Sequence, residues 1–440
     1  MPELIVCKYG GSSITSQEDV ERIKRITSEN PCRKIVVVSA PGKKDMHDAK
    51  VTDMLIELAK SKSRPLLEKI VEKYSSLCPG ENMGWLARKL QRRLSQPIEH
   101  AAHLDAIKAF GEEASAIVIA RAIGAEFVNP KSLFLVSEDY GNSNILQQSD
   151  DMIRKKLLGK AGIAVVPGFY GYTKSGNIAT FSRGGSDLTG AYISASLDAA
   201  LYENFTDTSG IYAASPELVE NPKKIGILTF DEIRDLSYSG FKVFHEMAMH
   251  PIGKKRIPVH VRNTFTYPAE GTYIVHDRLT EANQPIVGVA YSGGLCSFDA
   301  AIFGLNNMQG IGRKILQIFE DEGMSVEFIT TGIDDISVIL KDEQLTGHPN
   351  RIGLITDKLY TIMGRDATIR FQEHLGSLVV AGKGLKGKKG ISANIQMTLA
   401  EADINIKFIS QGPLERCIIY GIEHSEGKKA VNAIYDKYIR

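Results

Sequence analysis

The first 280 residues alternate short apolar runs with segments that favour helices. Residues 34–38 and 161–166 are rich in valine, isoleucine and alanine, whereas residues 17–28 and 188–200 have the pattern of helices. Continuous apolar strands that alternate with helices form a largely parallel sheet covered on both faces. The sequence therefore predicts an α/β fold with a mainly parallel sheet flanked by helices. Sheets of this kind bind ligands at the carboxyl ends of their strands.

A lysine and two glycines follow the first apolar run, residues 4–7. The sequence KYGGSS at residues 8–13 would end a buried strand with one cation and several bare backbone amides facing the same space. This arrangement suits an anionic phosphate chain. The spacing of the glycines matches neither a Walker loop nor a Rossmann fingerprint. A strand followed by Gly-Gly is also a common structural turn, so the motif alone leaves both interpretations open.

Residues 181–187 (FSRGGSD) open the predicted helix 188–200. Arg183 could hold a carboxylate through two hydrogen bonds, close to a helix N-terminus that also favours anions. The structural alternative is that the glycines make a turn and Ser186 or Asp187 caps the helix. Because one turn combines a guanidinium, two glycines and a carboxylate, the pattern favours a functional site.

Residues 203–212 (ENFTDTSGIY) belong to the next predicted strand and its loop. Their hydroxyl, carboxylate and tyrosine groups could hold a nucleoside by ribose contacts and base stacking, although the same residues also suit an ordinary polar turn. Farther on, Lys242 offers a second lysine within the sequence GFKVFH. A lone lysine is usually a solvated surface residue, so Lys242 gains meaning only from the other motifs.

The chain of 440 residues has 53 basic and 52 acidic residues, which gives a net charge of +1. It lacks a basic stripe, so small metabolites are favoured as partners over nucleic acid. The five cysteines are scattered and predict neither a disulfide framework nor a zinc site. No apolar stretch has the length of a signal sequence or a membrane span. We therefore expect a cytoplasmic protein of two or three domains that does not contact a membrane.

Residues 60–108 interrupt the alternating pattern with a charged segment that favours helices. Leu66, Ile70, Tyr74 and Leu77 recur in it at helical spacing. This pattern leaves open whether the segment packs against the rest of the domain or forms a lid.

The C-terminal third of the chain contains an internal repeat. Residues 324–332 (MSVEFITTG) align with residues 404–412 (INIKFISQG), 80 positions later. Apolar residues in the preceding helical segments and in the following strands match as well. Each copy is predicted as strand, glycine turn, helix, strand, turn and strand, so this region holds two copies of one small α+β module.

Taken together, the motifs resemble those of the aspartate kinases, members of the amino acid kinase superfamily. The shared segments follow the family's order and spacing over nearly the whole chain. They are KYGGSS at 8–13, VVVSA at 36–40, TDML at 52–55, FGE at 110–112, SRGGSD at 182–187, TDTSGIY at 206–212 and FKVFH at 241–245. The repeated module looks like the tandem ACT domains of the same enzymes. The resemblance implies an amino acid kinase catalytic domain over residues 1–280 and two ferredoxin-like ACT modules over 281–365 and 366–440.

The resemblance implies that MgATP and L-aspartate react to give ADP and 4-phospho-L-aspartate, the first step toward lysine, threonine and methionine. The nucleotide would carry the Mg²⁺ ion, without a ligand from the protein. A β-carboxylate with a pKa near ~4 is already ionised at neutral pH and needs no general base. The reaction needs relief of the repulsion between anions and in-line placement of the reacting groups. The lysines, the arginine and the glycine amides of the motifs suit both needs.

Site residues are assigned by matching the motifs to the family. The catalytic residues would be Lys8, at the transferring phosphoryl group, and Asp187. The residues expected to bind the substrate amino acid are Ser39, Thr52, Glu112, Arg183, Gly184 and Ser186. Of these, Arg183 would hold the α-carboxylate and Glu112 the ammonium group. The residues expected to bind the nucleotide are Lys8, Gly10, Gly11, Ser12, Thr206, Asp207, Tyr212, Lys242 and Val243.

The ACT modules imply allosteric feedback regulation by lysine, with threonine as a second candidate effector, and a homodimer or homotetramer with effectors at the subunit interface. The effector residues expected from the resemblance are Ile311, Glu327 and Thr331. Lysine-sensitive relatives often carry Asp and Ser where this chain has Glu327 and Gly332. Glu327 could still hold an effector ammonium, whereas Gly332 has no hydroxyl.

Two segments depart from the family pattern. Family members usually have Asp-Pro-Arg where residues 215–217 are Ser-Pro-Glu, and the acidic Glu217 would weaken contacts to phosphate. The family's Val-Leu-His-Pro is Val-Phe-His-Glu at residues 243–246. Two alternatives to an aspartate kinase therefore stay open: an amino-acid kinase directed at another acid such as glutamate, and a catalytically silent amino-acid sensor.

Overall fold

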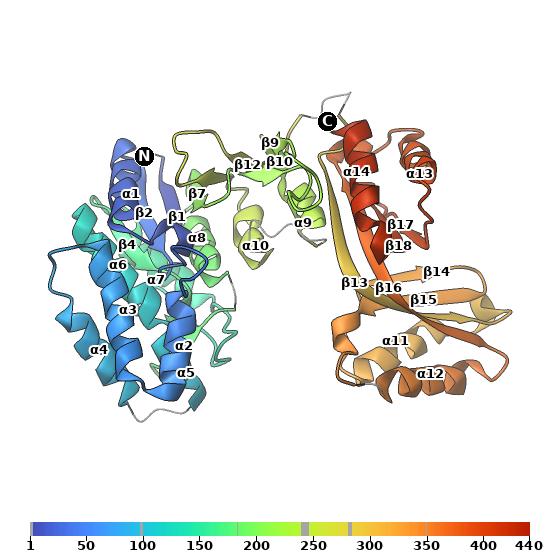
Figure 1. Cartoon of the computed structure of the whole chain (residues 1–440), viewed down its shortest axis with the longest axis horizontal. Coiled ribbons are helices and arrows are strands. Elements are labelled where there is room, and N and C mark those ends of the chain that lie inside the picture. The colour runs from blue at the N-terminus through green and yellow to red at the C-terminus, as the bar shows by residue number, and fades with distance from the viewer. Residues whose placement is uncertain (1–2, 97–99, 183, 239–245, 280–283, 349) are drawn as a thin grey trace. The chain divides into compact units, whose positions relative to one another are not determined.

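The computed structural model describes residues 3–96, 100–182, 184–238, 246–279, 284–348 and 350–440. By packing, the chain divides into two units, which are drawn in Figure 1. The first unit comprises residues 1–211, 224–230 and 242–278, and the second comprises residues 212–223, 231–241 and 279–440. Each unit has its own sheet and its own hydrophobic core.

The first unit is built on an eight-stranded sheet in the order β10-β12-β11-β7-β1-β2-β4-β3. Its strands are β1 (Ile5–Tyr9), β2 (Arg33–Val38), β3 (Glu126–Phe127), β4 (Ala164–Pro167), β7 (Leu201–Thr206), β10 (Ile227–Thr229), β11 (Val259–Asn263) and β12 (Thr272–Val275). All neighbouring strands are parallel except β11 and β12. The predicted, mainly parallel sheet is thus confirmed. A hairpin of β5 (Tyr170–Tyr172) and β6 (Ile178–Thr180) follows β4.

Helices cover both faces of this sheet (Figure 1). The helices of this unit are α1 (Gln17–Glu29), α2 (Val51–Ser61), α3 (Arg64–Leu77), α4 (Gly84–Leu94), α5 (His100–Lys108), α6 (Phe110–Ile123), α7 (Gln148–Leu157), α8 (Gly185–Ser196) and α10 (Glu246–Lys254). One core joins the sheet to α1, α2, α3 and α6, and it includes the buried side chains of Tyr9, Ile23 and Leu55. Helix α8 packs against β1 and β7 on the other face. Alternate side chains of β1 therefore enter two different environments.

The segment 60–108 belongs to this core. Ile70, Tyr74 and Leu77 of α3 are buried, and the Tyr74 hydroxyl donates to the Gly111 carbonyl in α6 over 2.7 Å. The helical spacing of apolar residues in this segment therefore reflects packing of α3 against the helices that cover the sheet.

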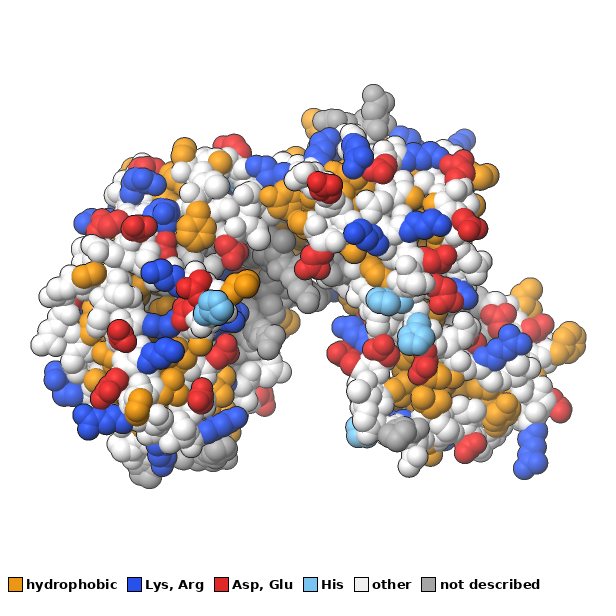
Figure 2. Space-filling model, in the orientation of Figure 1, with side chains coloured by type: hydrophobic (Ala, Val, Ile, Leu, Met, Phe, Trp, Pro, Cys, Tyr) orange, Lys and Arg blue, Asp and Glu red, His pale blue; other side chains and the backbone are white. Residues whose placement is uncertain are grey.

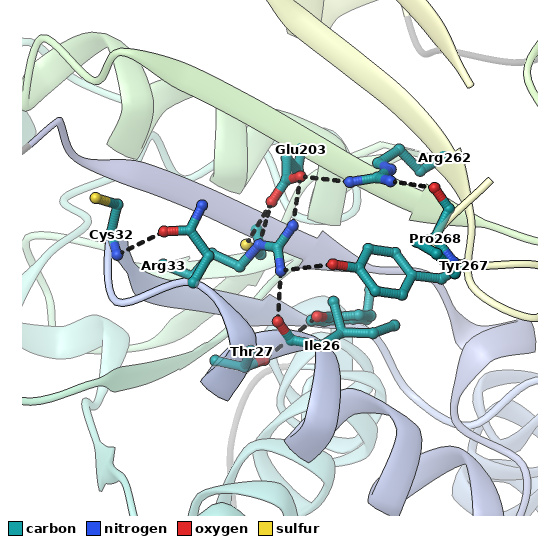
Figure 3. Close-up of polar contacts among 11 residues, drawn as sticks. Ile26, Thr27, Cys32, Arg33, Glu203, Arg262, Tyr267 and Pro268 are labelled. Carbon is teal, nitrogen blue, oxygen red and sulfur yellow. Dashed lines mark hydrogen bonds and ion pairs between the residues drawn. The ribbon is translucent and has the colours of Figure 1, made fainter. Parts of the chain in front are cut away.

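Three charged side chains lie buried among the central strands (Figure 3). Glu203 on β7 accepts hydrogen bonds from Nε and Nη2 of Arg33 on β2, over 2.6 and 2.8 Å, and from Arg262 on β11 over 3.2 Å. Arg33 also donates to the Ile26 carbonyl in α1, and Arg262 donates to the Pro268 carbonyl. Burial alone would raise the pKa of the Glu203 carboxyl, but the hydrogen bonds and charge of Arg33, with the charge of Arg262, lower it below its ordinary value. The cluster ties β2, β7, β11 and α1 together.

The second unit is built on a six-stranded antiparallel sheet in the order β14-β15-β13-β16-β18-β17. Its strands are β13 (Gly288–Ala301), β14 (Phe328–Thr331), β15 (Asp335–Lys341), β16 (Thr368–Ala381), β17 (Phe408–Ser410) and β18 (Cys417–Glu423). Its helices include α11 (Ile311–Asp321), α12 (Asn350–Met363), α13 (Ile391–Glu401) and α14 (Gly427–Tyr438). Helix α13 begins 80 residues after α11, and β16 begins 80 residues after β13, so the predicted repeat is confirmed.

The two modules of the repeat share their longest strands. β13 and β16 have 14 residues each and pair along most of their length. The C-terminal half of β13 pairs with β15, whereas the C-terminal half of β16 pairs with β18. Each long strand therefore serves as the first strand of one module and the last strand of the other. The first module thereby has the βαββαβ order of the ferredoxin-like fold, whereas the second takes its remaining strand from the N-terminal half of β13, which precedes that module in the chain.

Two segments from the predicted kinase region pack in the second unit. The Val289 amide at the start of β13 donates to the Ala213 carbonyl over 2.8 Å. Glu232, in α9 (Phe230–Tyr238), is buried and accepts from the Lys383 amide over 2.8 Å. The predicted domain ranges, 1–280, 281–365 and 366–440, stay a prediction.

The described surface carries charges of both signs. Figure 2 shows Lys and Arg side chains interspersed with Asp and Glu on the face that it draws. All five cysteines are free thiols. Among the residues that the structure describes, none of the helices combines the length and the apolar character that a membrane crossing requires.

We expect Glu203→Ala to destabilise the first unit by about 3–5 kcal/mol, because the substitution leaves two buried guanidinium groups without their carboxylate. The measurement is urea-induced unfolding followed by circular dichroism. The control is Glu68→Ala, which breaks the exposed Arg64–Glu68 pair and should change the unfolding free energy by at most about 0.5 kcal/mol. Equal effects of the two substitutions would contradict the proposed importance of the buried cluster.

Candidate active site

The strand order brings the predicted motifs to one edge of the sheet. β1 lies between β7 and β2, and β4 follows β2, with all of these strands parallel. The chain leaves these strands at Gly10, Ser39, Gly168 and Asp207. Because the carboxyl ends of parallel strands share one edge, these turns lie together. Ligands bind in open α/β sheets at such an edge, at the point where the connections leave in opposite directions.

The two predicted catalytic residues are in direct contact. Nζ of Lys8 lies 2.7 Å from Oδ1 of Asp187, which belongs to the first turn of α8. Asn204 on β7 joins them, since Nζ of Lys8 donates to its Oδ1 over 3.4 Å and its Nδ2 donates to Oδ1 of Asp187 over 3.2 Å. Lys8 is only 8% exposed, so its ammonium charge depends on these partners.

The glycine turn after β1 faces the Lys8 ammonium. A Cβ atom added to Gly10 would lie 3.5 Å from Nζ of Lys8. A Cβ atom added to Gly11 would lie 2.6 Å from the Ala40 carbonyl oxygen, and the Gly42 amide donates to the Gly11 carbonyl over 2.8 Å. A side chain at Gly11 would therefore push apart the turns that follow β1 and β2.

The backbone groups of this turn have different partners. The Gly10 amide donates to the Phe205 carbonyl of β7 over 3.0 Å and so extends the sheet. The hydroxyls of Ser13 and Thr264 lie 2.6 Å apart and fix the turn to the end of β11. A phosphate beside Lys8 would therefore meet the amides of Gly11 and Ser12 rather than that of Gly10.

Glu112, in the first turn of α6, is a buried carboxyl close to the turn after β2. Its Oε1 accepts from the Ala40 amide over 3.2 Å, and its Oε2 is buried without a hydrogen-bond partner among the described residues. Burial raises the pKa of Glu112 to about 8, although the Ala40 hydrogen bond and the charge of Lys108 act in the opposite direction. An ammonium group of a ligand would supply the missing donor.

Ser39 and Thr52 flank the same turn. Ser39 directly precedes Ala40, and Thr52 lies in the first turn of α2. The Val51 amide donates to the Pro41 carbonyl over 3.1 Å, which joins the start of α2 to the turn. Ser39 and Thr52 are both half-buried, so their hydroxyls lie at the border of the turn rather than in the core.

The start of α8 touches the turn after β4. Gly184 caps the helix with a φ of 76°, a left-handed conformation that favours glycine. Ser186 is buried, and a Cβ atom added to Gly168 would lie 2.7 Å from the Ser186 side chain. The predicted substrate residues of this helix thus lie at the same edge as Lys8.

The loop after β7 is held by the end of β11. The Thr206 hydroxyl donates to the Asp207 carboxylate over 3.1 Å, and Nδ2 of Asn263 donates to the Asp207 carbonyl over 3.0 Å. Tyr212 ends β8 (Ile211–Tyr212), is half-buried and belongs to the second unit. The remaining predicted site residues, Arg183, Lys242 and Val243, lie outside the described residues.

Comparisons with known proteins agree with this fold and site. A model of the amino acid kinase family matches residues 3–263, and a model of an ACT domain matches residues 378–438. Aspartokinase 3 of Bacillus subtilis is 37% identical over 450 aligned residues, which cover 98% of each chain. The chain belongs to the aspartokinases of the amino acid kinase family. It is therefore a phosphotransferase with a carboxyl group as acceptor.

Solved structures lead to the same family. The aspartate kinase of Clostridium acetobutylicum, described as an allosteric enzyme, is 31% identical and matches with a TM-score of 0.86 over 99% of this chain and 100% of that one. Aspartokinase III of E. coli, solved with aspartate and ADP, is 20% identical and matches with a TM-score of 0.77 over 100% of both chains. Because the sequence identity to the E. coli enzyme is only 20%, this second match shows a shared fold alone.

The predicted effector residues of this aspartokinase occupy different places in the second unit. Thr331 lines a cavity of about 310 Å³ together with Asp299 and Lys407. Ile311 begins α11, whereas Glu327 directly precedes β14. Neither residue belongs to the described lining of that cavity. Glu327 instead accepts a hydrogen bond from the Tyr238 hydroxyl at the end of α9.

Sequence reasoning missed the polar residues that support the site from within the sheet. Arg33, Glu203 and Arg262 form the buried cluster, Asn204 contacts both catalytic candidates, and Asn263 holds the Asp207 loop. Each of them is a charged or amide side chain that is buried within a strand of the sheet. Because buried polar groups need partners, such residues were the available signal.

Proposed function

We propose that this kinase transfers the γ-phosphoryl group of MgATP to the β-carboxylate of L-aspartate and releases ADP and 4-phospho-L-aspartate. The observation that carries the proposal is the contact of the buried Lys8 with Asp187 beside the glycine turn, in a chain that belongs to the aspartokinases. The structure of E. coli aspartokinase III, which has the same fold, holds aspartate and ADP.

Lys8 neutralises the phosphoryl group during transfer. Its ammonium exchanges Asp187 for an oxygen of the γ-phosphate, while the amides of Gly11 and Ser12 donate to the same chain of phosphates. By the resemblance to the family, Lys242 and Val243 complete the proposed set of nucleotide-binding residues. Catalysis then consists of positioning and charge neutralisation, because the carboxylate nucleophile is already ionised.

The substrate amino acid is held by its two α-substituents. Glu112 accepts from the ammonium group through its unpartnered Oε2. Arg183 clamps the α-carboxylate, and Gly184 and Ser186 shape the start of α8 around it. The hydroxyls of Ser39 and Thr52 border the same space. These contacts leave the β-carboxylate free to face the nucleotide.

The nucleoside lies at the loop after β7. The Thr206 hydroxyl and the Asp207 carboxylate contact the ribose. Glu217, in place of an arginine that the family usually has, is exposed, and its amide donates to the Ser215 hydroxyl over 3.3 Å. The nucleotide phosphates therefore depend on the lysines.

Lysine, or threonine, regulates the kinase through the ACT modules, and the modules join copies of the chain into a homodimer or homotetramer. Two features support assembly: β14 and β17 form the two edges of the described sheet, and they expose Ile329 and Ile409. The free thiols of all five cysteines support a reducing compartment, for which we propose the cytoplasm.

Lys8→Ala should lower kcat by about 100- to 1,000-fold, because removing one charge-stabilising donor costs ~3–4 kcal/mol in the transition state. The measurement traps the acyl phosphate with hydroxylamine and is run with aspartate and with glutamate in parallel. Lys24→Ala, at an exposed lysine on α1, is the control and should keep the activity. If hydroxamate forms with glutamate alone, glutamate rather than aspartate is the substrate. If it forms with neither acid, the proposed phosphorylation of a carboxylate is contradicted.

The KM for aspartate should fall as the pH rises toward 8. With a pKa of about 8, Glu112 is mostly protonated below that pH, and it must lose its proton before it can pair with the substrate ammonium. The expected change is at most about tenfold per pH unit, and it should level off once the carboxyl is ionised. Glu112→Gln should raise the KM and flatten this profile, so a variant that keeps the wild-type profile would remove Glu112 from the site.

Tyr238→Phe should increase the sensitivity to lysine. The Tyr238 hydroxyl donates to the same Glu327 carboxylate that we assign to the effector ammonium, so its removal frees that carboxylate. Phenylalanine keeps the ring, whose centroid lies 5.7 Å from that of Phe328. Loss of a competing hydrogen bond of about 1 kcal/mol lowers the half-inhibitory concentration about fivefold. Glu327→Gln should weaken inhibition, and unchanged inhibition curves for both variants would place the effector elsewhere.

A further inference from the structure

Asn204 is a neutral amide buried between two opposite charges. Its Cα pairs with that of Lys8 in the parallel ladder of β1 and β7, so both side chains lie on the face of the sheet that α8 covers. Only 2% of Asn204 is exposed. Its Oδ1 accepts from Nζ of Lys8 over 3.4 Å, and its Nδ2 donates to Oδ1 of Asp187 over 3.2 Å.

The charges fix the orientation of this amide. An ammonium group can only donate hydrogen bonds, so it meets the carbonyl end of Asn204, and an ionised carboxylate can only accept, so it meets the NH₂ end. With Lys8 and Asp187 themselves 2.7 Å apart, the three groups form a closed triangle. Each charge therefore has two partners.

We propose that Asn204 is a positioning residue that lets Lys8 exchange Asp187 for a phosphate oxygen. When the ammonium turns toward the glycine turn, Oδ1 of Asn204 keeps one contact to it, and Nδ2 keeps one contact to the carboxylate that the lysine leaves. Neither charge is left without a partner during the exchange, and an unpartnered charge at this largely buried position would be destabilising.

Without Asn204, Asp187 would remain as the described partner of Lys8, and the lysine would be held more firmly in that pair. It would contact the phosphoryl group less often and in poorer geometry, and even a small displacement of a reacting group lowers the reaction rate strongly. Asn204 therefore acts through Lys8 and Asp187, and it need not touch the substrates. The inference rests on the proposed phosphoryl transfer and deepens it.

The test compares Asn204→Leu with Asn204→Asp in the full-length protein. Leucine fills a similar volume without polar atoms, and kcat should fall about 10- to 100-fold while the KM values for ATP and aspartate change less than about threefold. Ser194→Ala is the matched control, because Ser194 is a buried polar residue of α8 whose hydroxyl donates to the Gly190 carbonyl over 2.7 Å. The control should keep kcat within about twofold.

The aspartate variant gives a signature that a purely structural role would not produce. A protonated carboxyl offers a carbonyl acceptor to Lys8 and an O–H donor to Asp187, as the amide does, whereas an ionised carboxyl has no donor and repels Asp187. The kcat of Asn204→Asp relative to wild type should therefore rise as the pH falls. The ionisation of the introduced carboxyl should be absent from the pH profiles of the wild type and of Asn204→Leu. Asn204→Asp also decides the question if Asn204→Leu does not fold.

Two results would overturn the inference. One is a folded Asn204→Leu variant with wild-type kcat. The other is an Asn204→Asp variant whose pH profile has the wild-type shape. Failure of the proposed reaction is recognised separately, because the wild-type protein would then form no aspartyl hydroxamate. A wild-type protein that forms hydroxamate, beside an Asn204→Leu variant that does so equally fast, rejects the role of Asn204 alone.

Discussion

The parallel pairing of β1 with β7 is the constraint on which both the core and the candidate site depend. It sets Cys7 opposite Glu203 and Lys8 opposite Asn204. Because successive side chains point to opposite faces, the first pair joins the buried cluster and the second pair faces α8. A shift of one residue in this register would send Lys8 into the apolar core and Cys7 toward Asp187.

Buried charge on both faces of this pairing makes the register specific. On one face, Glu203 binds Arg33 of β2 and Arg262 of β11, and on the other, Lys8 binds Asp187 and Asn204. Removing one partner of such a group leaves an uncompensated charge, which destabilises strongly, whereas the intact group adds little net stability. The same arrangement that aligns the strands thus presents one ammonium at the carboxyl edge, where a phosphate can take over its charge.

Much of this architecture could be predicted from the residues, and the reasons are local. Apolar runs between helical segments predicted the parallel sheet, and the match between residues 324–332 and 404–412 predicted the paired modules. Lys8, Asp187 and Glu112 stand in short motifs, so their importance was visible along the chain. The importance of Asn204, Arg33 and Arg262 was not visible in this way, because their contacts form only once β2, β1, β7 and β11 are assembled in one sheet. The interleaving of β13 with β16 was hidden for the same reason.

By itself, the sequence determined which segments form strands and helices, that the C-terminal module is repeated, and which motifs can meet phosphate and amino-acid groups. Periodicity and residue type act over a few neighbouring residues, so they can be read without knowing the fold. Only the tertiary structure decided which buried polar groups become partners and that each long strand serves two modules. It also buries Glu112 and thereby raises its pKa to about 8. Those properties depend on contacts between residues far apart in the chain, and folding supplies them.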